Sequence, residues 1–148
     1  MISTKLEWKE KMAFEADVNE HKLRIDVPMS GGGQNTGPTP KQLLLTAVAG
    51  CTGLDVVSIL NKMRLKIASF SIDANASVAD EYPAVFEKVK LNYRLSGTEL
   101  KAEKVIIAVE KSQTKYCAIS AMVAKTAKIE YEIFLNNQSI ATGQSHFA

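Results

Sequence analysis

The segment from Thr39 to about Met63 most constrains what this chain can fold into, because it reads as one long helix that is apolar on nearly every side. Thr39 is a typical N-cap, and Pro40 follows at the first helical position, where its missing N–H costs no hydrogen bond. A surface helix carries a single apolar stripe, so this helix is expected to be buried on most sides. Because 148 residues can hardly cover such a helix, we expect a homodimer in which a partner subunit wraps it.

The apolar run from Leu43 to Leu60 approaches the length of a membrane span, but its composition argues against one. Asp55 would cost about 2.5 to 3.5 kcal/mol near the centre of a bilayer. The N-terminal sequence MISTKLEWKEK has neither a basic segment followed by an apolar one nor a cleavage site of small residues. We therefore expect a cytoplasmic protein with a buried central helix and no membrane contact.

The rest of the chain alternates between strand and helix patterns. Residues 4–27 alternate apolar and polar side chains around a turn at 19–21, which predicts an antiparallel meander. The stretch 28–38 holds four glycines and two prolines and is therefore a loop, without the lysine and hydroxyl of a phosphate loop. Further segments follow as strands at 68–74 and 86–95, helices at 99–113 and 118–125, a strand at 129–133 and a short final strand. This order predicts one α+β domain over residues 1–148, with mainly antiparallel sheets.

Charge and composition exclude several classes of function. The formal net charge is only +2, and the lysines are scattered among glutamates, so nucleic acid is not the implied partner. With two histidines in the chain, neither beside a nucleophile motif, no serine–histidine–acid set is indicated, and no dinucleotide-binding glycine motif follows the first strands. By elimination, any chemistry on this chain is expected to run through sulfur.

The two cysteines, Cys51 and Cys117, are 117 − 51 = 66 residues apart and form no CxxC pair. Zinc is not expected, because His21 and His146 lie far from both cysteines in the sequence. The residues alone leave three interpretations open, namely buried thiols that pack as small hydrophobic groups, a disulfide, or a reactive thiol. No cofactor is indicated either.

The local settings of the cysteines differ. Cys117 precedes AISAMVAKTA and falls near the start of a helix, where unpaired N–H groups should lower the pKa of its thiol. Asp55 follows Cys51 by four residues and lies on the same helical face. A carboxylate there would raise a thiol pKa, so the simpler interpretation of Asp55 is a hydrogen-bonded polar residue at a packing site.

Read together, the glycine-rich loop leading into TPKQLLLTAVAGC, the second lone cysteine in KYCAISAMVAKT and the final strand pair resemble the OsmC and organic hydroperoxide resistance family. The resemblance is to a divergent branch and covers nearly the whole chain. It implies an α+β fold in which an intertwined homodimer packs two long central helices against sheets from both subunits.

The resemblance also implies an activity. Cys51 matches the thiol that attacks an organic hydroperoxide, and Cys117 matches the resolving thiol. A dithiol reductant would then regenerate both thiols. Such a chain would be a thiol peroxidase, an oxidoreductase without a cofactor. Lys41 stands where the family has a glutamate after the helix-opening proline, and the first arginine, Arg24, falls later in the chain than the family's arginine. We therefore assign neither the family's glutamate nor its arginine to a residue of this chain. The alternative is a non-enzymatic dimer that binds a small hydrophobic ligand in an interface pocket.

Overall fold

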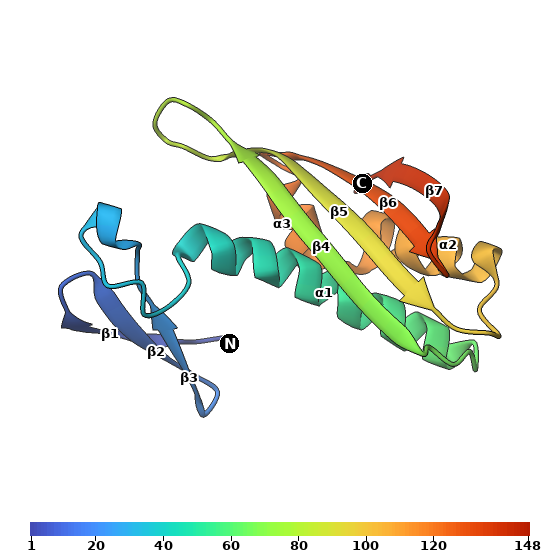
Figure 1. Ribbon diagram of the computed structural model, residues 1–148, viewed down its shortest axis with the longest axis horizontal. Helices are drawn as coiled ribbons and strands as arrows, with labels where there is room; N and C mark the ends of the chain where they lie inside the picture. Colours follow the sequence, from blue (N-terminus) through green and yellow to red (C-terminus); the bar gives the residue numbers. More distant parts are fainter. The chain divides into compact units, whose positions relative to one another are not determined.

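The computed structural model describes residues 1–148, and the chain divides into two compact units, Met1–Leu44 and Leu45–Ala148. The division falls inside the long helix α1 (Pro40–Lys62), so its first residues belong to the first unit and the others to the second. Figure 1 labels the elements in chain order. The single domain expected over residues 1–148 stays a prediction.

The first unit contains a three-stranded antiparallel sheet in the order β1-β2-β3. Its strands are β1 (Lys5–Glu10), β2 (Ala13–Val18) and β3 (His21–Ile25). The turn between β2 and β3 places Asn19 and Glu20 at positive φ, 47° and 67°. The predicted meander and its turn are therefore confirmed.

The glycine-rich segment after β3 is a loop, as predicted, with one short turn of 3-10 helix, η1 (Met29–Gly31). It folds around the buried carboxylate of Asp26, which accepts hydrogen bonds from the Thr36 hydroxyl at 2.6 Å and from the backbone N–H of Thr36 at 3.0 Å and of Gln34 at 3.2 Å. These bonds, with that of Thr36 foremost, hold the pKa of Asp26 well below its usual range. The anion that this loop encloses is thus a side chain of the protein itself.

Helix α1 begins as the sequence predicts. The Gln42 N–H donates to Thr39 Oγ1 at 3.4 Å, and the Thr39 N–H donates to Gln42 Oε1 at 2.8 Å, so the two residues form a capping box. The helix ends at Lys62, one residue before the predicted Met63.

Only one stripe of α1 is buried within the chain: Val48, Thr52, Val56 and Leu60, spaced four residues apart. Leu54, on another side of the helix, is 76% exposed. The expectation of a helix covered on most sides is therefore not met by a single chain. By length and hydropathy alone α1 could cross a membrane, a test that central helices of soluble proteins also pass.

The second unit contains a four-stranded sheet in the order β4-β5-β6-β7. Its strands are β4 (Ser69–Val78), β5 (Phe86–Ser96), β6 (Lys128–Leu135) and β7 (Gln138–Gln144). The pairs at both edges are antiparallel, whereas β5 and β6 are parallel. A parallel pair needs a long crossover connection. Here it consists of α2 (Ala102–Lys111), a π-helical turn η2 (Ser112–Tyr116) and α3 (Ala118–Val123).

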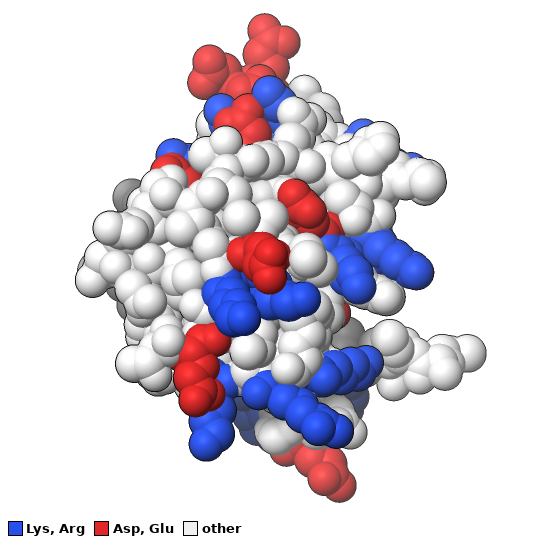
Figure 2. Space-filling model, turned by 90° about the vertical axis from the view of Figure 1, so that its right-hand side faces the viewer, with Lys and Arg blue, Asp and Glu red and all other residues white.

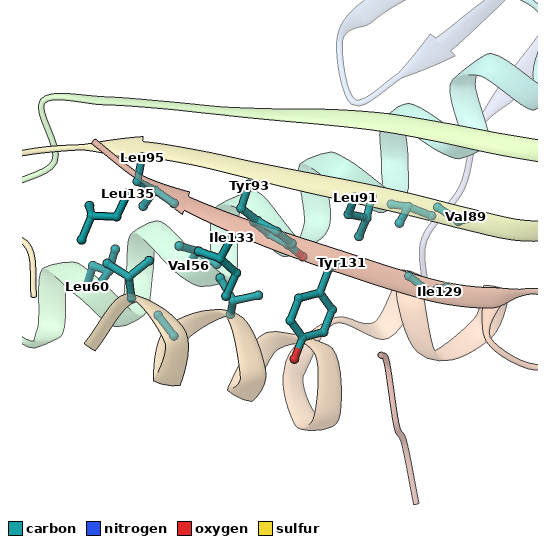
Figure 3. Packing of buried hydrophobic residues seen from close by; sticks show 14 of the residues in the cluster. Val56, Leu60, Val89, Leu91, Tyr93, Leu95, Ile129, Tyr131, Ile133 and Leu135 are labelled. Carbon is teal, nitrogen blue, oxygen red and sulfur yellow. The ribbon is translucent and has the colours of Figure 1, made fainter. Parts of the chain in front are cut away.

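The main core lies between this sheet and helices α1 and α2, which cover the same face (Figure 3). Alternate residues of β5 and β6 point toward the helices: Val89, Leu91, Tyr93, Leu95, Ile129, Tyr131, Ile133 and Leu135. The α+β class and the mainly antiparallel pairing are therefore confirmed.

Most of the other residues of β5 and β6 carry charged side chains, and several of them form ion pairs. Lys88 contacts Glu130 at 2.5 Å, and Arg94 contacts Asp73 of β4 at 2.8 Å. The Arg94 guanidinium also lies 4.4 Å from the centre of the Phe134 ring. Figure 2 shows basic and acidic side chains together on one face of the molecule.

Candidate functional site

The fold brings the two cysteines together. Cys51 lies in the interior of α1, and Cys117 is the residue that caps the start of α3. Both are free thiols. The two Sγ atoms and a carboxylate oxygen of Asp55 all lie within 4.8 Å of one another. A disulfide needs its sulfurs about 2.05 Å apart, so a small local movement would let these two thiols join.

Cys117 is fully buried, and its sulfur accepts a hydrogen bond from the Ser120 N–H at 3.3 Å. This is the helix-terminus interaction that the sequence predicts, and it acts in the expected direction. Burial outweighs it, and with the neighbouring Cys51 sulfur raises the pKa of the Cys117 thiol to about 11. The expectation of a lowered pKa at Cys117 is therefore wrong, because α3 supplies one N–H while the whole site removes water from the sulfur.

Cys51 is the accessible member of the pair, since its side chain is only partly buried. The backbone around it is open on one side: a Cβ placed on the preceding Gly50 would meet no atom within 4 Å. On the other side, a Cβ on Gly53 would approach Ile72 of β4 at 3.4 Å, which is ordinary van der Waals contact. A substrate could therefore reach Cys51 more easily than Cys117.

Asp55 lies one helical turn after Cys51 and is held in place by Ser112. The Ser112 hydroxyl donates to Asp55 Oδ2 at 2.9 Å. The sequence-based interpretation of Asp55 as a hydrogen-bonded residue at a packing site is thus confirmed. The same carboxyl group also lies beside both sulfurs, which the sequence indicated for Cys51 alone.

A network of buried polar groups continues from Ser112 into the core. Ser112 Oγ lies 2.7 Å from Thr52 Oγ1, which in turn lies 2.8 Å from the Tyr93 hydroxyl. Gln113 Nε2 donates to that hydroxyl at 2.9 Å, and Gln113 Oε1 accepts from the Ser145 hydroxyl. Burial raises the pKa of Tyr93 well above its usual value, so the phenol stays protonated and can donate.

The donors in this network all point toward Asp55. Each hydroxyl has one hydrogen, and Ser112 gives its hydrogen to Asp55 Oδ2. Thr52 must therefore donate to Ser112, and Tyr93 must donate to Thr52. The carboxylate is the final acceptor of the chain of hydrogen bonds, which fixes its orientation beside the sulfurs.

Little in the sequence indicates this network. Thr52 looked like one of several small polar residues in an apolar helix, and Tyr93 like one more apolar strand residue. Ser112 and Gln113 open the π-helical turn between α2 and α3, a deviation from regular helix that often accompanies functional sites. The spacing of the segment KSQTKYC does not reveal that turn.

A surface cavity of about 420 Å³ adjoins the carboxylate side of the site. It is lined by Asp55, Ser58, Ile59, Lys62, Met63, Lys111 and Tyr116. Its floor is partly apolar, and its two lysines are the cations of the lining. The cavity is of the size that small-molecule sites have in general.

Lys41 and Arg24, the charged residues at which this chain differs from the family it resembles, lie in the first unit. Lys41 is exposed in the first turn of α1, as expected of a solvated residue. Arg24 of β3 donates from Nε to Thr36 Oγ1 at 2.7 Å and lies 3.7 Å from Glu10. Both histidines, His21 and His146, are exposed.

Comparison with known proteins gives consistent matches. A family model described as OsmC-like protein matches residues 31–132. Protein YhfA of Escherichia coli strain K12 is 29% identical to this chain over 134 residues, which cover 89% of this chain and 98% of that protein.

Solved structures show the same fold. The crystal structure of a hypothetical protein from Aquifex aeolicus VF5 has a TM-score of 0.78 at 25% identity, and the match covers 92% of this chain and 98% of that one. The organic hydroperoxide resistance protein OsmC of Legionella pneumophila has a TM-score of 0.69 over 90% of this chain and 96% of its own. At 18% identity, this second likeness concerns the fold alone.

Proposed function

Since this chain belongs to the OsmC-like protein family, we propose that it reduces organic hydroperoxides through a two-cysteine cycle in which Cys51 attacks and Cys117 resolves. The observation that carries the proposal is the closeness of two free thiols from distant segments, with both sulfurs within 4.8 Å of each other. Solved structures of this fold include a protein named for organic hydroperoxide resistance, which supports the same chemistry.

The assignment of roles rests on access and ionisation. The partly exposed Cys51 can meet a substrate, whereas Cys117 is buried and its pKa is raised to about 11. Cys117 reacts only after Cys51 has been oxidised, so Cys117 does not need to be ionised before that step.

The reaction balances without a cofactor. The Cys51 thiolate attacks the outer oxygen of the hydroperoxide, the O–O bond breaks, and the alkoxide takes a proton and leaves as an alcohol. Cys51 is now a sulfenic acid, which Cys117 attacks to form a disulfide and release water. A dithiol reductant then returns both thiols and becomes a disulfide itself.

Asp55 is the group best placed to move the proton in the first step. A carboxylate does not ionise a thiol by its charge, since it disfavours a second negative group nearby. As a proton acceptor within 4.8 Å of the Cys51 sulfur, it can take the thiol proton, which leaves the thiolate to attack, and can return that proton to the leaving alkoxide. The Ser112 hydroxyl keeps the carboxylate in that orientation.

The proposal includes a homodimer in a reducing compartment. The side of α1 opposite its buried stripe exposes apolar residues, among them Leu54 at 76%, and a second subunit would cover them. Two free thiols this close together stay reduced in the cytoplasm, where disulfides are rare.

A second candidate function is favoured by the cavity beside Asp55. A dimer without peroxidase activity could hold a small hydrophobic ligand against Ile59 and Met63. The two proposals differ in their dependence on sulfur, because binding in the cavity needs neither cysteine, whereas the peroxidase needs Cys51 above all.

The test measures the loss of cumene hydroperoxide in the presence of dithiothreitol. The native chain should consume peroxide over many turnovers, and Cys51→Ser should be no faster than the uncatalysed reaction. Cys117→Ser, treated with one equivalent of cumene hydroperoxide in the absence of dithiothreitol, should accumulate a Cys51 sulfenic acid that dimedone traps. If the native chain is no faster than Cys51→Ser, the peroxidase proposal is wrong, and retained binding of a hydrophobic probe by both proteins would favour the second function.

A further inference from the structure

The cluster of Cys51, Asp55 and Cys117 combines two sulfurs with a carboxylate oxygen in one small volume. The sequence argued against zinc because no histidine lies near either cysteine, and both histidines are indeed exposed elsewhere. The fold supplies a different third group, since Asp55 stands one helical turn after Cys51 and faces the same space. Cysteine sulfur and aspartate oxygen are both common ligands of zinc.

We propose that Cys51, Asp55 and Cys117 form a binding site for Zn²⁺ in the reduced protein. In a tetrahedral site with Zn–S near 2.3 Å and Zn–O near 2.1 Å, neighbouring ligand atoms lie roughly 3.5 to 3.8 Å apart. The three atoms here all lie within 4.8 Å of one another without an ion. A shift of about 1 Å or less in the side chains would therefore bring them to coordination distance.

Groups around the cluster make the hydrogen bonds that orient ligands in known metal sites. Ligating carboxylates are normally oriented by a hydrogen bond to an outer group, and the Ser112 hydroxyl makes such a bond to Asp55 Oδ2 at 2.9 Å. That bond fixes the carboxylate and leaves its other oxygen free of Ser112.

Ser120 makes the corresponding contact with the second sulfur, that of Cys117. Its N–H already donates to Cys117 Sγ at 3.3 Å, while its fully buried hydroxyl has no hydrogen-bond partner, which is uncommon for a buried polar atom. A metal-bound thiolate at Cys117 would give the hydroxyl an acceptor.

Binding balances as an exchange of protons for the metal. Each of the two thiols loses its proton to solvent when its sulfur coordinates Zn²⁺, and Asp55 joins as a carboxylate. The fourth position is left to water, because Cys51 and Asp55 are only partly buried. Three protein ligands with one open position is the arrangement of catalytic zinc sites, whereas structural sites are closed by four protein ligands.

This inference goes beyond the proposed peroxidase and does not rest on it. Zinc needs only two reduced thiols and the carboxylate, so a chain without any peroxidase activity would bind it equally well. In a chain that does reduce peroxides, bound zinc would occupy Cys51 and withhold it from the substrate.

The test uses Co²⁺, which takes the same sites as Zn²⁺ and reports its ligands by absorption. Reduced, metal-free full-length protein would be titrated with Co²⁺ in the absence of oxygen and peroxide. We expect a sulfur-to-cobalt charge-transfer band and strong visible bands typical of tetrahedral cobalt, saturating at one ion per chain. Added Zn²⁺ should abolish both, and zinc binding to the metal-free protein should release two protons per chain.

Matched variants assign the ligands. Cys51→Ser and Cys117→Ser should each lose most of the charge-transfer band, and Asp55→Asn, which keeps both thiols, should bind more weakly. Ser112→Ala should weaken binding about ten- to hundredfold through the orientation of the carboxylate. Asp73→Asn, a change at an exposed carboxylate that pairs with Arg94, should bind as the native chain does.

Two results would overturn the inference. One is the absence of a sulfur-to-cobalt band at one equivalent of Co²⁺ in protein whose thiols are shown to be reduced. The other is a band that persists unchanged in Asp55→Asn and in either serine variant, with circular dichroism showing that these variants are folded.

Discussion

The Thr52 and Ser112 hydroxyls lie 2.7 Å apart and join the buried stripe of α1 to the π-helical turn between α2 and α3. The two cysteines depend on the same junction, since Cys51 immediately precedes Thr52 and Cys117 follows the turn. A bond between buried hydroxyls therefore helps to set the distance between the sulfurs. Tyr93 extends the junction to the sheet, at 2.8 Å from Thr52.

Replacing Thr52 by valine should destabilise the protein although the two side chains have the same shape. The change leaves the Tyr93 hydroxyl without its acceptor and removes the donor to Ser112, and an unsatisfied buried polar group costs about 1 to 3 kcal/mol. Urea denaturation of Thr52→Val measures the loss. Ser58→Ala, an exposed change in the same helix, should alter the free energy of unfolding by only about 0.5 kcal/mol or less. Equal effects of the two variants would show that the network contributes no stability.

The raised pKa of Cys117 predicts a loss of stability at alkaline pH. The folded protein holds this thiol proton up to about 11, whereas a thiol in the unfolded chain has a pKa of about 8.5. The protonated thiol therefore contributes its full stability below about pH 8.5, and the contribution declines as the pH rises toward the folded pKa.

Comparison of two variants isolates that contribution from other groups that titrate in the same range. The difference in unfolding free energy between the native chain and Cys117→Ala should shrink as the pH rises above about 8.5. Cys51→Ala serves as the control for the removal of a thiol. A difference between native and Cys117→Ala that stays constant with pH would contradict the raised pKa.

Asp26 predicts the opposite dependence, at acid pH. Its pKa is lowered in the folded protein, chiefly by the hydrogen bond from the Thr36 hydroxyl. The ionised carboxylate therefore stabilises the fold above the unfolded pKa of about 3.9, and this contribution declines as the pH falls below that value.

Asp26→Asn should accordingly lower the melting temperature at neutral pH and approach the native value in strong acid. The amide would also turn N–H groups toward the backbone donors of Gln34 and Thr36. Asp17→Asn, at a half-exposed aspartate that pairs with Lys22, should shift the melting temperature far less. Thermal denaturation followed by circular dichroism over a pH series checks the prediction, and equal shifts for both variants would contradict it.

Local patterns in the sequence were enough to predict most secondary structure. The helix from Pro40 to Lys62 follows from its cap and its apolar length, and Gln42 completes the capping box. The parallel pairing of β5 with β6 was not predictable, because strand direction is decided by the crossover that joins them. The π-helical turn was also missed, since its residues have no composition that marks it.

At the site too, local contacts were predictable from the sequence, whereas effects of tertiary packing were not. The hydrogen bond from Ser120 to Cys117 could be inferred from a helix start near a cysteine, but the sign of the pKa shift could not. Burial decides that sign, and the sequence around Cys117 does not reveal it. The closeness of Cys51 and Cys117 was implied by a family resemblance, whereas the residues alone left a packing role, a disulfide and a reactive thiol all open.

The exposed side of α1 predicts how the chain associates. Leu54 is 76% exposed in the single chain, on a helix that is apolar on nearly every side. In the proposed homodimer this side is covered, and burial of a leucine side chain contributes about 1.5 to 3 kcal/mol. Leu54→Lys should therefore weaken the dimer by roughly tenfold or more, because about 1.4 kcal/mol corresponds to a factor of ten in the dissociation constant.

Sedimentation equilibrium over a range of protein concentrations measures that change. A matched control is Leu54→Met, which keeps an apolar side chain of similar volume and should leave the dimer almost unchanged. In the monomer Leu54 touches little, so the lysine variant should keep its secondary structure even where it dissociates. A native chain that sediments as a monomer at all concentrations would contradict the homodimer, and so would a Leu54→Lys dimer as tight as the native one.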